Sequence, residues 1–405
     1  MSHQDLSENY DLVVIGAGII GLSTAISALE FNSSYKVMIL EKEECIAVHG
    51  SGRNSGVVHA GFYYSPDSLK AQFCRVGNQE IKKFARQHNL PINRCGKVVV
   101  TKNDDEDIRV ETLFNRGVCN GVDLELLPGA DLPRFEPTAK TNNLFVWSPQ
   151  TAILDPKLLL KAMLGQYISL GGKIAFKTSS ELRFEKNEVV LLANQKRVKS
   201  KKIVNAAGAF ADQLAKQIGV GSRFAVVPFK GCYRKSTELS RSKALIYPVP
   251  HPVNPFLGVH TTLTSEGYLK IGPTAMPAFG RENYHFFENL HVREVLEILK
   301  AIGYVVKGRK HNLIQILKEE IPLLSQKGLT KKAGQLSIEI SEKHSWKKPP
   351  TGIRSQLVDI ENGELVQDFV VEEFGNSLHF LNIVSPGWTS AFPFTRHFMS
   401  DFLKK

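Results

Sequence analysis

The segment Tyr10-Asp-Leu-Val-Val-Ile-Gly-Ala-Gly-Ile-Ile-Gly21 decides the fold of this chain. Its first half is short, apolar and β-branched, which is typical of a buried parallel strand. A glycine turn follows, and Ile19–Leu29 is then rich in Ala, Leu and Ile, which predicts a helix. A second apolar strand is predicted over Lys36–Leu40. This order of strand, turn, helix and strand predicts a βαβ unit.

The spacing of the glycines within that unit predicts a dinucleotide site. Gly16 permits the tight turn, Gly18 lets the backbone approach a pyrophosphate, and Gly21 lets helix and strand pack closely. The first turn of the helix, which includes Ile20, offers unpaired N–H groups and partial positive charge to phosphates. A glycine pattern alone is weak, but here a strand precedes it and a helix follows it.

Glu41 and Lys42 stand at the end of the second strand, where the ribose of a dinucleotide is expected. The carboxylate of Glu41 can accept hydrogen bonds from both ribose hydroxyls. It would also repel a 2′-phosphate, which disfavours NADP. These residues do not separate FAD from NAD, so an NAD-dependent dehydrogenase remains open at this point.

Composition indicates an ordinary globular protein. Hydrophobic residues make up 42% and charged residues 22% of 405 residues. The five cysteines are scattered without a CxxC pair, so neither a disulfide framework nor a metal site is expected. The net charge is +11. This charge suits an anionic substrate, and no motif supports nucleic-acid binding.

The short polar N-terminus lacks the pattern of a signal or transit peptide. No stretch approaches the roughly 20 apolar residues of a membrane span. We therefore expect a cytoplasmic protein, with the inner face of a membrane as the alternative location. The basic amphipathic stretch Val292–Lys318 is the segment that would meet a membrane surface, although we expect it to pack on the substrate lobe.

The segment Gly52-Arg-Asn-Ser-Gly-Val-Val-His-Ala-Gly-Phe-Tyr-Tyr64 narrows the family. It closely resembles the L-2-hydroxyglutarate oxidase/dehydrogenase family of the D-amino-acid-oxidase-like superfamily. Further matching segments are Arg94–Lys97, Ser148–Asp155, Asn205–Gly208, Pro255–His260, Gly352–Asp359 and Ser385–Gly387 with Thr389 and Ser390. The resemblance covers nearly the whole chain and is weakest over Asn289–Lys348.

The resemblance implies FAD as the cofactor and assigns residues to it. The loop that begins at Gly52 runs along the pyrophosphate and isoalloxazine in this superfamily. The Asn205–Gly208 turn and the Ser385–Thr389 segment contact or close over the flavin. Together with the glycine turn, the expected FAD-binding residues are Gly16, Gly18, Ile20, Gly21, Glu41, Lys42, Arg53, Asn54, Ser55, Gly56, Ala207, Gly208, Pro386, Gly387 and Thr389.

The expected fold is α/β, or α+β overall, with a Rossmann-like FAD-binding lobe and a substrate lobe built on an antiparallel sheet. Residues 1–80, 150–225 and 350–405 are expected to form the discontinuous FAD-binding lobe. Residues 81–149 and 226–349 are expected to form the substrate-binding lobe. Pro128–Pro156 is interpreted as a crossing between the lobes, and Phe392–Leu403 as a final helix.

The implied reaction is oxidation of L-2-hydroxyglutarate to 2-oxoglutarate. A hydride passes from Cα to the flavin, and the hydroxyl loses a proton. A neutral histidine is a suitable acceptor for that proton. His59 in the flavin loop and His260 on a predicted strand are the candidates. Arg354 is the candidate clamp for a substrate carboxylate. Lys70, Tyr64 and Arg281 are secondary substrate contacts.

Several alternatives stay open. Electrons would pass to a quinone, the respiratory chain or oxygen. The substrate could be another 2-hydroxy acid or an amine, as in glycine and sarcosine oxidases. A second cationic clamp would favour a five-carbon dianion, whereas an aromatic cage would favour an amine. A flavin-binding protein without catalysis is the remote alternative, and the oligomeric state stays open.

Overall fold

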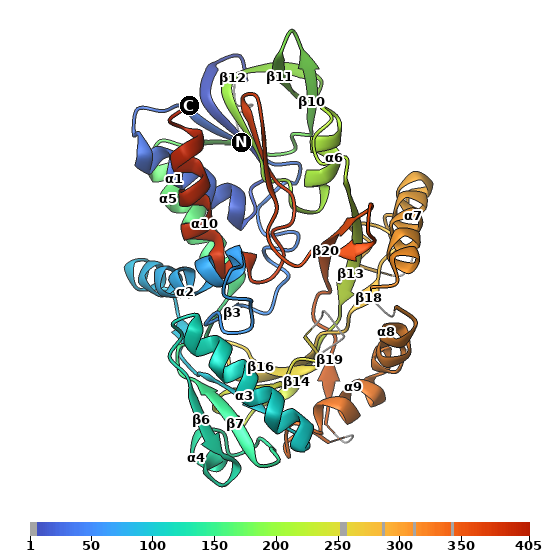
Figure 1. The fold of residues 1–405 in the computed structure, drawn as a ribbon. Coiled ribbons are helices and arrows are strands. Elements are labelled where there is room, and N and C mark those ends of the chain that lie inside the picture. Colours follow the sequence, from blue (N-terminus) through green and yellow to red (C-terminus); the bar gives the residue numbers. More distant parts are fainter. Residues whose placement is uncertain (1–5, 252–256, 286–287, 311–312, 342–343) are drawn as a thin grey trace.

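The computed structural model describes residues 6–251, 257–285, 288–310, 313–341 and 344–405. It has two lobes with a smaller sheet between them (Figure 1). Pro255 and Phe256, which belong to one of the matching segments, lie outside the described residues. No helix in the described part of the chain has the length and apolar character needed to cross a bilayer.

The upper lobe in Figure 1 is built on a parallel sheet with the strand order β9-β2-β1-β12-β23. These strands are β1 (Asn9–Ile15), β2 (Val37–Leu40), β9 (Lys173–Ala175), β12 (Lys196–Asn205) and β23 (Ser377–Phe380). Three antiparallel strands extend it, namely β10 (Ser180–Glu185), β11 (Glu188–Ala193) and β22 (Val371–Phe374). Ile15 lies opposite both Leu40 and Asn205, so the central strands end at one edge.

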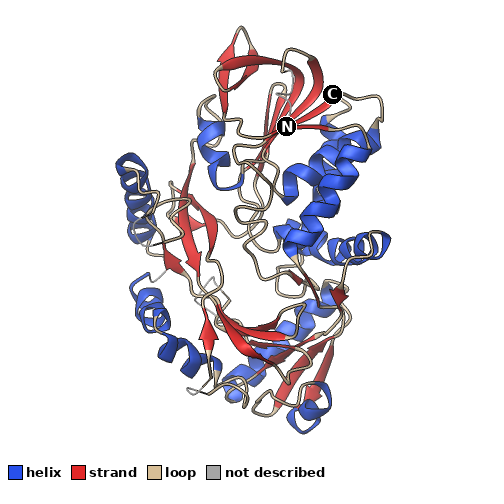
Figure 2. Ribbon diagram, turned by 180° about the vertical axis from the view of Figure 1, so that it is seen from behind, coloured by secondary structure: helices blue, strands red, loops and turns tan. Residues whose placement is uncertain are grey.

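Four helices cover one face of this sheet and gather on one side of it (Figure 2). They are α1 (Ile19–Phe31), α2 (Leu69–Gln87), α5 (Pro156–Ser169) and α10 (Gly387–Phe402). Leu22, Met163 and Phe394 are fully buried in their shared core. Asp155 is the N-cap of α5, since its carboxylate accepts from Lys157 N at 2.8 Å. Helix α6 (Ala211–Lys216) packs in the core on the opposite face.

The lower lobe is built on an eight-stranded sheet with the order β19-β14-β17-β16-β15-β5-β7-β6. Its strands are β5 (Lys97–Val100), β6 (Glu125–Pro128), β7 (Leu144–Ser148), β14 (Arg234–Leu239), β15 (Leu245–Pro248), β16 (His260–Leu263), β17 (Tyr268–Gly272) and β19 (Trp346–Lys347). The expected antiparallel pairing holds except between β5 and β15, which are parallel. No hairpin joins these two strands, so no tight turn fixes their direction.

Two smaller sheets connect the lobes. One has the order β18-β13-β20-β21, with β13 (Phe224–Gly231), β18 (Met276–Pro277), β20 (Gly352–Asp359) and β21 (Glu364–Leu365). The other places β8 (Ala152–Leu154) between β3 (Val57–Val58) and β4 (Ile92–Asn93). The remaining helices are α3 (Asp104–Cys119), η1 (Gly129–Asp131), α4 (Leu132–Phe135), η2 (Gly208–Phe210), α7 (Val292–Gly308), α8 (Leu313–Glu320), η3 (Ile321–Leu324) and α9 (Gln326–Ala333).

Three sequence interpretations need correction. Pro128–Pro156 is more than a crossing, because it contains β7 and β8. The last helix begins at Gly387 and accommodates Pro393 in its interior. Helix α3 was missed, although Asn103 caps it by accepting from Glu106 N at 2.9 Å. The parallel sheet draws its strands from the three segments assigned to the FAD-binding lobe. The lobe boundaries remain a prediction, and the one at residue 80 falls inside α2.

Candidate active site

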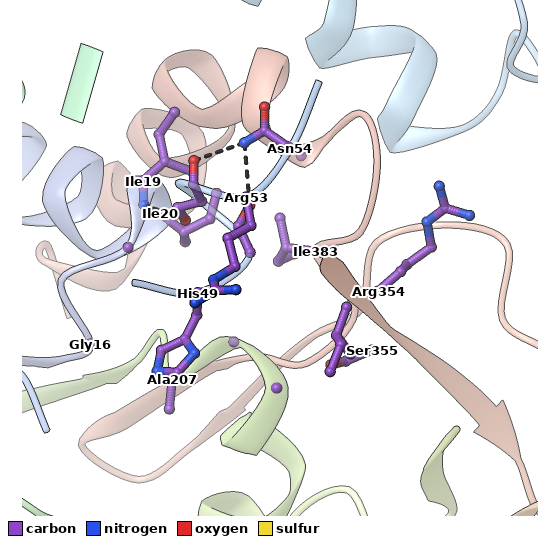
Figure 3. Close-up of a pocket in the computed structure, with 18 of the residues that line it drawn as sticks. Gly16, Ile19, Ile20, His49, Arg53, Asn54, Ala207, Arg354, Ser355 and Ile383 are labelled. Atoms are coloured by element: carbon purple, nitrogen blue, oxygen red, sulfur yellow. Dashed lines mark hydrogen bonds between the residues drawn. The ribbon is translucent and has the colours of Figure 1, made fainter. Parts of the chain in front are cut away.

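A cavity of about 560 Å³ lies at the carboxyl ends of the parallel strands. Its wall combines the glycine turn, the loop after β2, the turn after β12, strand β20 and the segment that enters α10. Figure 3 shows Arg354 and Ser355 on the side opposite Gly16 and Ile19. This position, at the strand ends of an open parallel sheet, is where such folds bind their ligands.

The glycine turn is shaped by close backbone contacts. Gly16 has φ +101, and a Cβ there would lie 2.6 Å from the carbonyl oxygen of Ala206. A Cβ on Gly21 would lie 1.8 Å from the carbonyl oxygen of Gly16. Helix α1 begins at Ile19, whose N–H donates to Ser51 Oγ at 3.0 Å. Its N-cap Gly18 has no side chain, and its first turn has no acidic residue. Its N-terminus, with Ile20 in the cavity wall, therefore presents donors to an anion.

Glu41 is fixed in the cavity wall by backbone donors. One carboxylate oxygen accepts from Ala17 N at 2.8 Å and the other from Glu43 N at 3.0 Å. Each carboxylate oxygen has a further lone pair, so the group can still accept hydrogen bonds from ribose hydroxyls.

Lys42 lies at the centre of a charged cluster beside the cavity. Glu43, His49 and Glu282 bring their ligand atoms within 4.8 Å of one another, in a metal-like arrangement. The Lys42 ammonium is hydrogen-bonded to Glu43, to Glu282 at 2.6 Å and to His49 Nε2 at 3.1 Å. Because this ammonium is already hydrogen-bonded to all three of these side chains, we assign no metal to them.

The loop before β3 is held by its own side chains. Asn54 Nδ2 donates to the carbonyls of Gly50 and Ser51 (dashed lines in Figure 3), and Asn54 Oδ1 accepts from Gly56 N at 2.8 Å. Gly56 has φ +76 and leaves no room for a Cβ, which would lie 2.4 Å from Leu154 O. The side chain of Asn54 therefore shapes the loop.

Arg53 and Ser55 tie the same loop to the rest of the site. The guanidinium of Arg53 lies 3.9 Å above the Tyr284 ring, and its Nε donates to the carbonyl of Val48. Ser55 hydrogen-bonds with Tyr233, which also lines the cavity. Both loop residues are in the cavity wall, where backbone groups remain for a pyrophosphate.

The remaining expected cofactor residues also line the cavity. Gly208 has φ +57, and a Cβ there would meet no atom within 4 Å, so this turn with Ala207 faces open space. Pro386 and Gly387 form the opposite edge. Thr389 Oγ1 accepts from His59 N at 3.2 Å and so joins the start of α10 to the flavin loop.

His59 lies in the cavity wall with its backbone fixed and its ring unbonded. Its carbonyl accepts from Asn78 Nδ2 at 3.0 Å, while its buried Nδ1 has no hydrogen-bond partner among the described residues. Burial, followed by the charges of Lys97, His260 and Arg354, lowers the pKa of His59 well below its usual value. The imidazole is therefore neutral at physiological pH and able to accept a proton.

His260 is a second neutral imidazole close to the first. Its Nδ1 lies 2.9 Å from the carbonyl oxygen of Gly258, and its ring stacks on Tyr247 at 3.9 Å. A carbonyl only accepts, so the hydrogen is on Nδ1 and Nε2 keeps its lone pair. Burial lowers the pKa of His260 to about 3.

Arg354 on β20 brings a half-buried cation to the cavity wall, near His59 and His260. Burial lowers its pKa, but a guanidinium stays charged under all ordinary conditions. Glu320, a buried carboxylate that accepts from Ala275 N, partly offsets this charge. The structure thus brings together His59, His260 and Arg354, which come from three separate segments of the chain.

The secondary substrate candidates divide into two groups. Lys70 Nζ lies 6.0 Å from the centre of the Tyr64 ring, and the Lys70 pKa is lowered to about 8 by burial, with Arg354 among the charges it senses. These two residues therefore lie near the arginine. Arg281 is placed differently, because its guanidinium forms a buried ion pair with Asp212. We leave Arg281 out of the substrate contacts proposed below.

Sequence reasoning missed Lys97 and the tyrosines around it as site residues. Lys97 begins β5, and its ammonium is completely buried 4.4 to 4.7 Å from the rings of Phe62, Tyr63 and Tyr247. Its charge acts on both His59 and His260. The sequence signals were its place in the matching segment Arg94–Lys97 and its position at the edge of an apolar strand, which is usually solvated.

Comparison with protein families finds a match over residues 11–319 to DAO, described as FAD dependent oxidoreductase. The chain is 35% identical over 398 residues to L-2-hydroxyglutarate dehydrogenase of Escherichia coli K12, covering 96% of this chain and 92% of that protein. It is 31% identical to the mitochondrial L-2-hydroxyglutarate dehydrogenase of Bos taurus, covering 95% and 87%.

Solved structures show the same fold at lower identity. L-α-glycerophosphate oxidase from Mycoplasma pneumoniae, solved with FAD bound, matches with a TM-score of 0.77 at 20% identity, covering 98% of this chain and 95% of that one. Glycine oxidase from Bacillus cereus matches with a TM-score of 0.71 at 19% identity, covering 98% and 97%. At these identities the likeness concerns the fold alone.

Proposed function

Since this chain belongs to the DAO family of FAD-dependent oxidoreductases, we propose that it oxidises L-2-hydroxyglutarate to 2-oxoglutarate. The supporting observation is the pair of neutral His59 and the half-buried cation Arg354 in the cavity wall, with neutral His260 near both. A 2-hydroxy acid needs both a proton acceptor for its hydroxyl and a cation for its carboxylate. The sequence similarity to L-2-hydroxyglutarate dehydrogenases supports the choice of acid.

The cavity fits FAD. The N-terminus of α1, with no acidic residue in its first turn, suits the pyrophosphate. Glu41 has lone pairs for the ribose, and the open space at Gly208 leaves room for the bound molecule. The residues that would hold it are the cavity-lining set of Gly16, Gly18, Ile20, Glu41, Arg53, Asn54, Ser55, Ala207, Gly208, Pro386, Gly387 and Thr389. When bound, FAD accepts the hydride from the substrate Cα.

The chain's own residues orient the substrate and move its proton. The guanidinium of Arg354 binds the carboxylate next to the hydroxyl through two parallel hydrogen bonds. The imidazole of His59, held neutral and facing the cavity, accepts the hydroxyl proton. Lys70 and Tyr64 contribute a second cation and a hydroxyl near Arg354, which favours a substrate with two carboxylates over an amine.

The proposed reaction predicts a stereospecific product. Purified enzyme with an artificial electron-accepting dye should convert L-2-hydroxyglutarate to 2-oxoglutarate, measured by chromatography. The D enantiomer should give none, because hydride transfer requires Cα–H to face the flavin while Arg354 holds the carboxylate. Glycine and sarcosine are the matched amine controls. Turnover of either amine in place of the hydroxy acid would contradict the proposed substrate.

We further propose that the electrons pass to a quinone at a membrane surface, which α7 contacts. Four apolar side chains of this helix are exposed by 47 to 78%, namely Val292, Leu296, Leu299 and Val306. Their spacing places them on one helical face, here called the α7 stripe. Arg293, Lys300 and Lys307 lie on the same helix. Exposed apolar residues beside basic ones are typical of a helix that lies in an anionic bilayer surface.

Vesicle binding tests the α7 stripe. The enzyme should sediment with phosphatidylglycerol vesicles and less with phosphatidylcholine vesicles, since anionic lipid attracts the lysines. Leu296→Glu should abolish sedimentation. Ile108→Glu is the matched control, because Ile108 is equally exposed, at 65% against 61%, but lies on α3. Equal binding by wild type and Leu296→Glu would contradict a role for α7.

A further inference from the structure

Lys97 is completely buried, unlike a lysine of the protein surface. It is 0% exposed, and its Nζ has no hydrogen-bond partner among the described residues. The rings of Phe62 and Tyr63 lie 4.4 Å from the ammonium, and that of Tyr247 lies at 4.7 Å. Three aromatic faces attract a cation, but they do not replace a counter-ion.

The ionisable groups that act on Lys97 do not neutralise it. The acidic group that acts on Lys97 is the thiol of Cys74 on α2. Burial raises the pKa of this thiol to about 12, so the thiol is uncharged. Tyr63 and Tyr247 are buried phenols, and burial raises the pKa of each. The remaining neighbours that sense Lys97 are His59 and His260. Arg354, the other cation that acts on both imidazoles, adds to the positive field.

Lys97 and His260 contact the same ring from separate strands. The Tyr247 ring lies 4.7 Å from Lys97 Nζ and 3.9 Å from the centre of the His260 ring. Phe62 and Tyr63, which complete the aromatic enclosure, follow His59 by three and four residues in the flavin loop. The Lys97 ammonium thus contacts the loop that carries His59 and the tyrosine on which His260 stacks.

We propose that Lys97 is a positioning residue of the reaction, whose enclosed ammonium adds to burial in keeping the imidazoles of His59 and His260 uncharged before the substrate binds. This inference rests on the proposed function. Burial alone lowers the pKa of Lys97 to about 7, and the three ring faces oppose this by favouring the charged form. A positive charge beside an imidazole disfavours the imidazolium.

The cost of this arrangement supports a functional origin. A buried cation without a counter-ion destabilises a fold, and an apolar side chain of similar size would avoid that cost. Methionine could fill the same aromatic enclosure, since its unbranched chain packs well against rings. Buried charges that lower the stability of a fold are typical of active sites, where the reaction uses them.

The pH profile of Lys97→Met tests the proposal. Without the ammonium the imidazole pKa rises, while burial still holds it below its usual value, so the acid limb of kcat/KM moves to higher pH. At about pH 5.5 the variant should therefore lose more of its kcat/KM, relative to about pH 8, than wild type does. Lys97→Arg should retain the wild-type profile, and Lys202→Met, a half-buried lysine that donates to Phe402 O, is the matched control.

Thermal unfolding gives a readout that does not depend on turnover. In wild type the lowered pKa values of Lys97, His59 and His260 mean that the unfolded chain binds more protons, so stability falls as pH falls. Lys97→Met removes part of this effect. The Tm of the variant should therefore exceed that of wild type by an amount that grows from pH 9 to pH 5.5.

The two readouts separate the possible failures. If wild type does not oxidise L-2-hydroxyglutarate, the proposed function fails and the Tm comparison still decides the charge of Lys97. If wild type is active and Lys97→Met keeps both its pH profile and a constant Tm difference, the role of Lys97 is overturned. Should Lys97→Met not fold, Lys97→Gln takes its place in both measurements.

Discussion

Arg354→Met should lower kcat/KM for L-2-hydroxyglutarate by roughly 30- to 4,000-fold, since losing one partner of a desolvated charge pair costs about 2–5 kcal/mol. The loss should appear mainly in KM if the guanidinium binds ground state and transition state alike. Arg354 lies on a regular strand in the cavity wall, so its replacement leaves the backbone in place. Steady-state kinetics with a dye acceptor measure the effect.

Two variants control the Arg354 experiment. Arg354→Lys keeps the charge but loses the planar pair of donors, so it should fall between wild type and Arg354→Met. Arg183→Met removes an arginine on β10 that is 54% exposed and should not change the kinetics. Unchanged KM and kcat in Arg354→Met would show that another cation binds the substrate carboxylate.

Gly21→Ala yields a protein that purifies without FAD. The added Cβ would lie 1.8 Å from the carbonyl oxygen of Gly16, so α1 must move away from the turn that it helps to form. Overpacking of this kind costs about 1–3 kcal/mol in a well-packed region. Displacing α1 also removes its N-terminal donors from the pyrophosphate site. The ratio of flavin absorbance to protein absorbance measures the loss.

Gly165→Ala is the matched control for this loss. Gly165 lies inside α5, and a Cβ there would meet no atom within 4 Å. Alanine in that helix should therefore stabilise the protein by about 0.5–1 kcal/mol and leave FAD content unchanged. A Gly21→Ala protein with full flavin content would contradict the assignment of the glycine turn to the cofactor.

Local patterns predicted the parts of the fold that depend on neighbouring residues. The βαβ unit follows from an apolar strand, three spaced glycines and an apolar helix, and β1, α1 and β2 lie where the sequence placed them. The cap at Asp155 is equally local. Helix α3 was missed although its cap at Asn103 and the acidic residues of its first turn are helix-start signals.

The site was harder to predict because its residues meet through long-range packing. In the sequence Arg281 looked like a cation available for substrate, and no neighbouring residue in the sequence indicates its buried ion pair with Asp212. Lys97 looked like a strand-edge lysine, and its burial depends on Phe62, Tyr63 and Tyr247 from other segments. His59 and Arg354 were named from the family resemblance. That they line the same cavity could be seen only in the structure.

Anaerobic reduction of the purified enzyme tests the central claim most directly. The oxidised protein should show flavin absorbance bands, and L-2-hydroxyglutarate without oxygen should bleach them in one rapid phase while D-2-hydroxyglutarate leaves them unchanged. That result would establish cofactor, reaction and stereochemistry together. Flavin bands that remain oxidised in the presence of excess L-2-hydroxyglutarate would contradict the proposed substrate while leaving the fold intact.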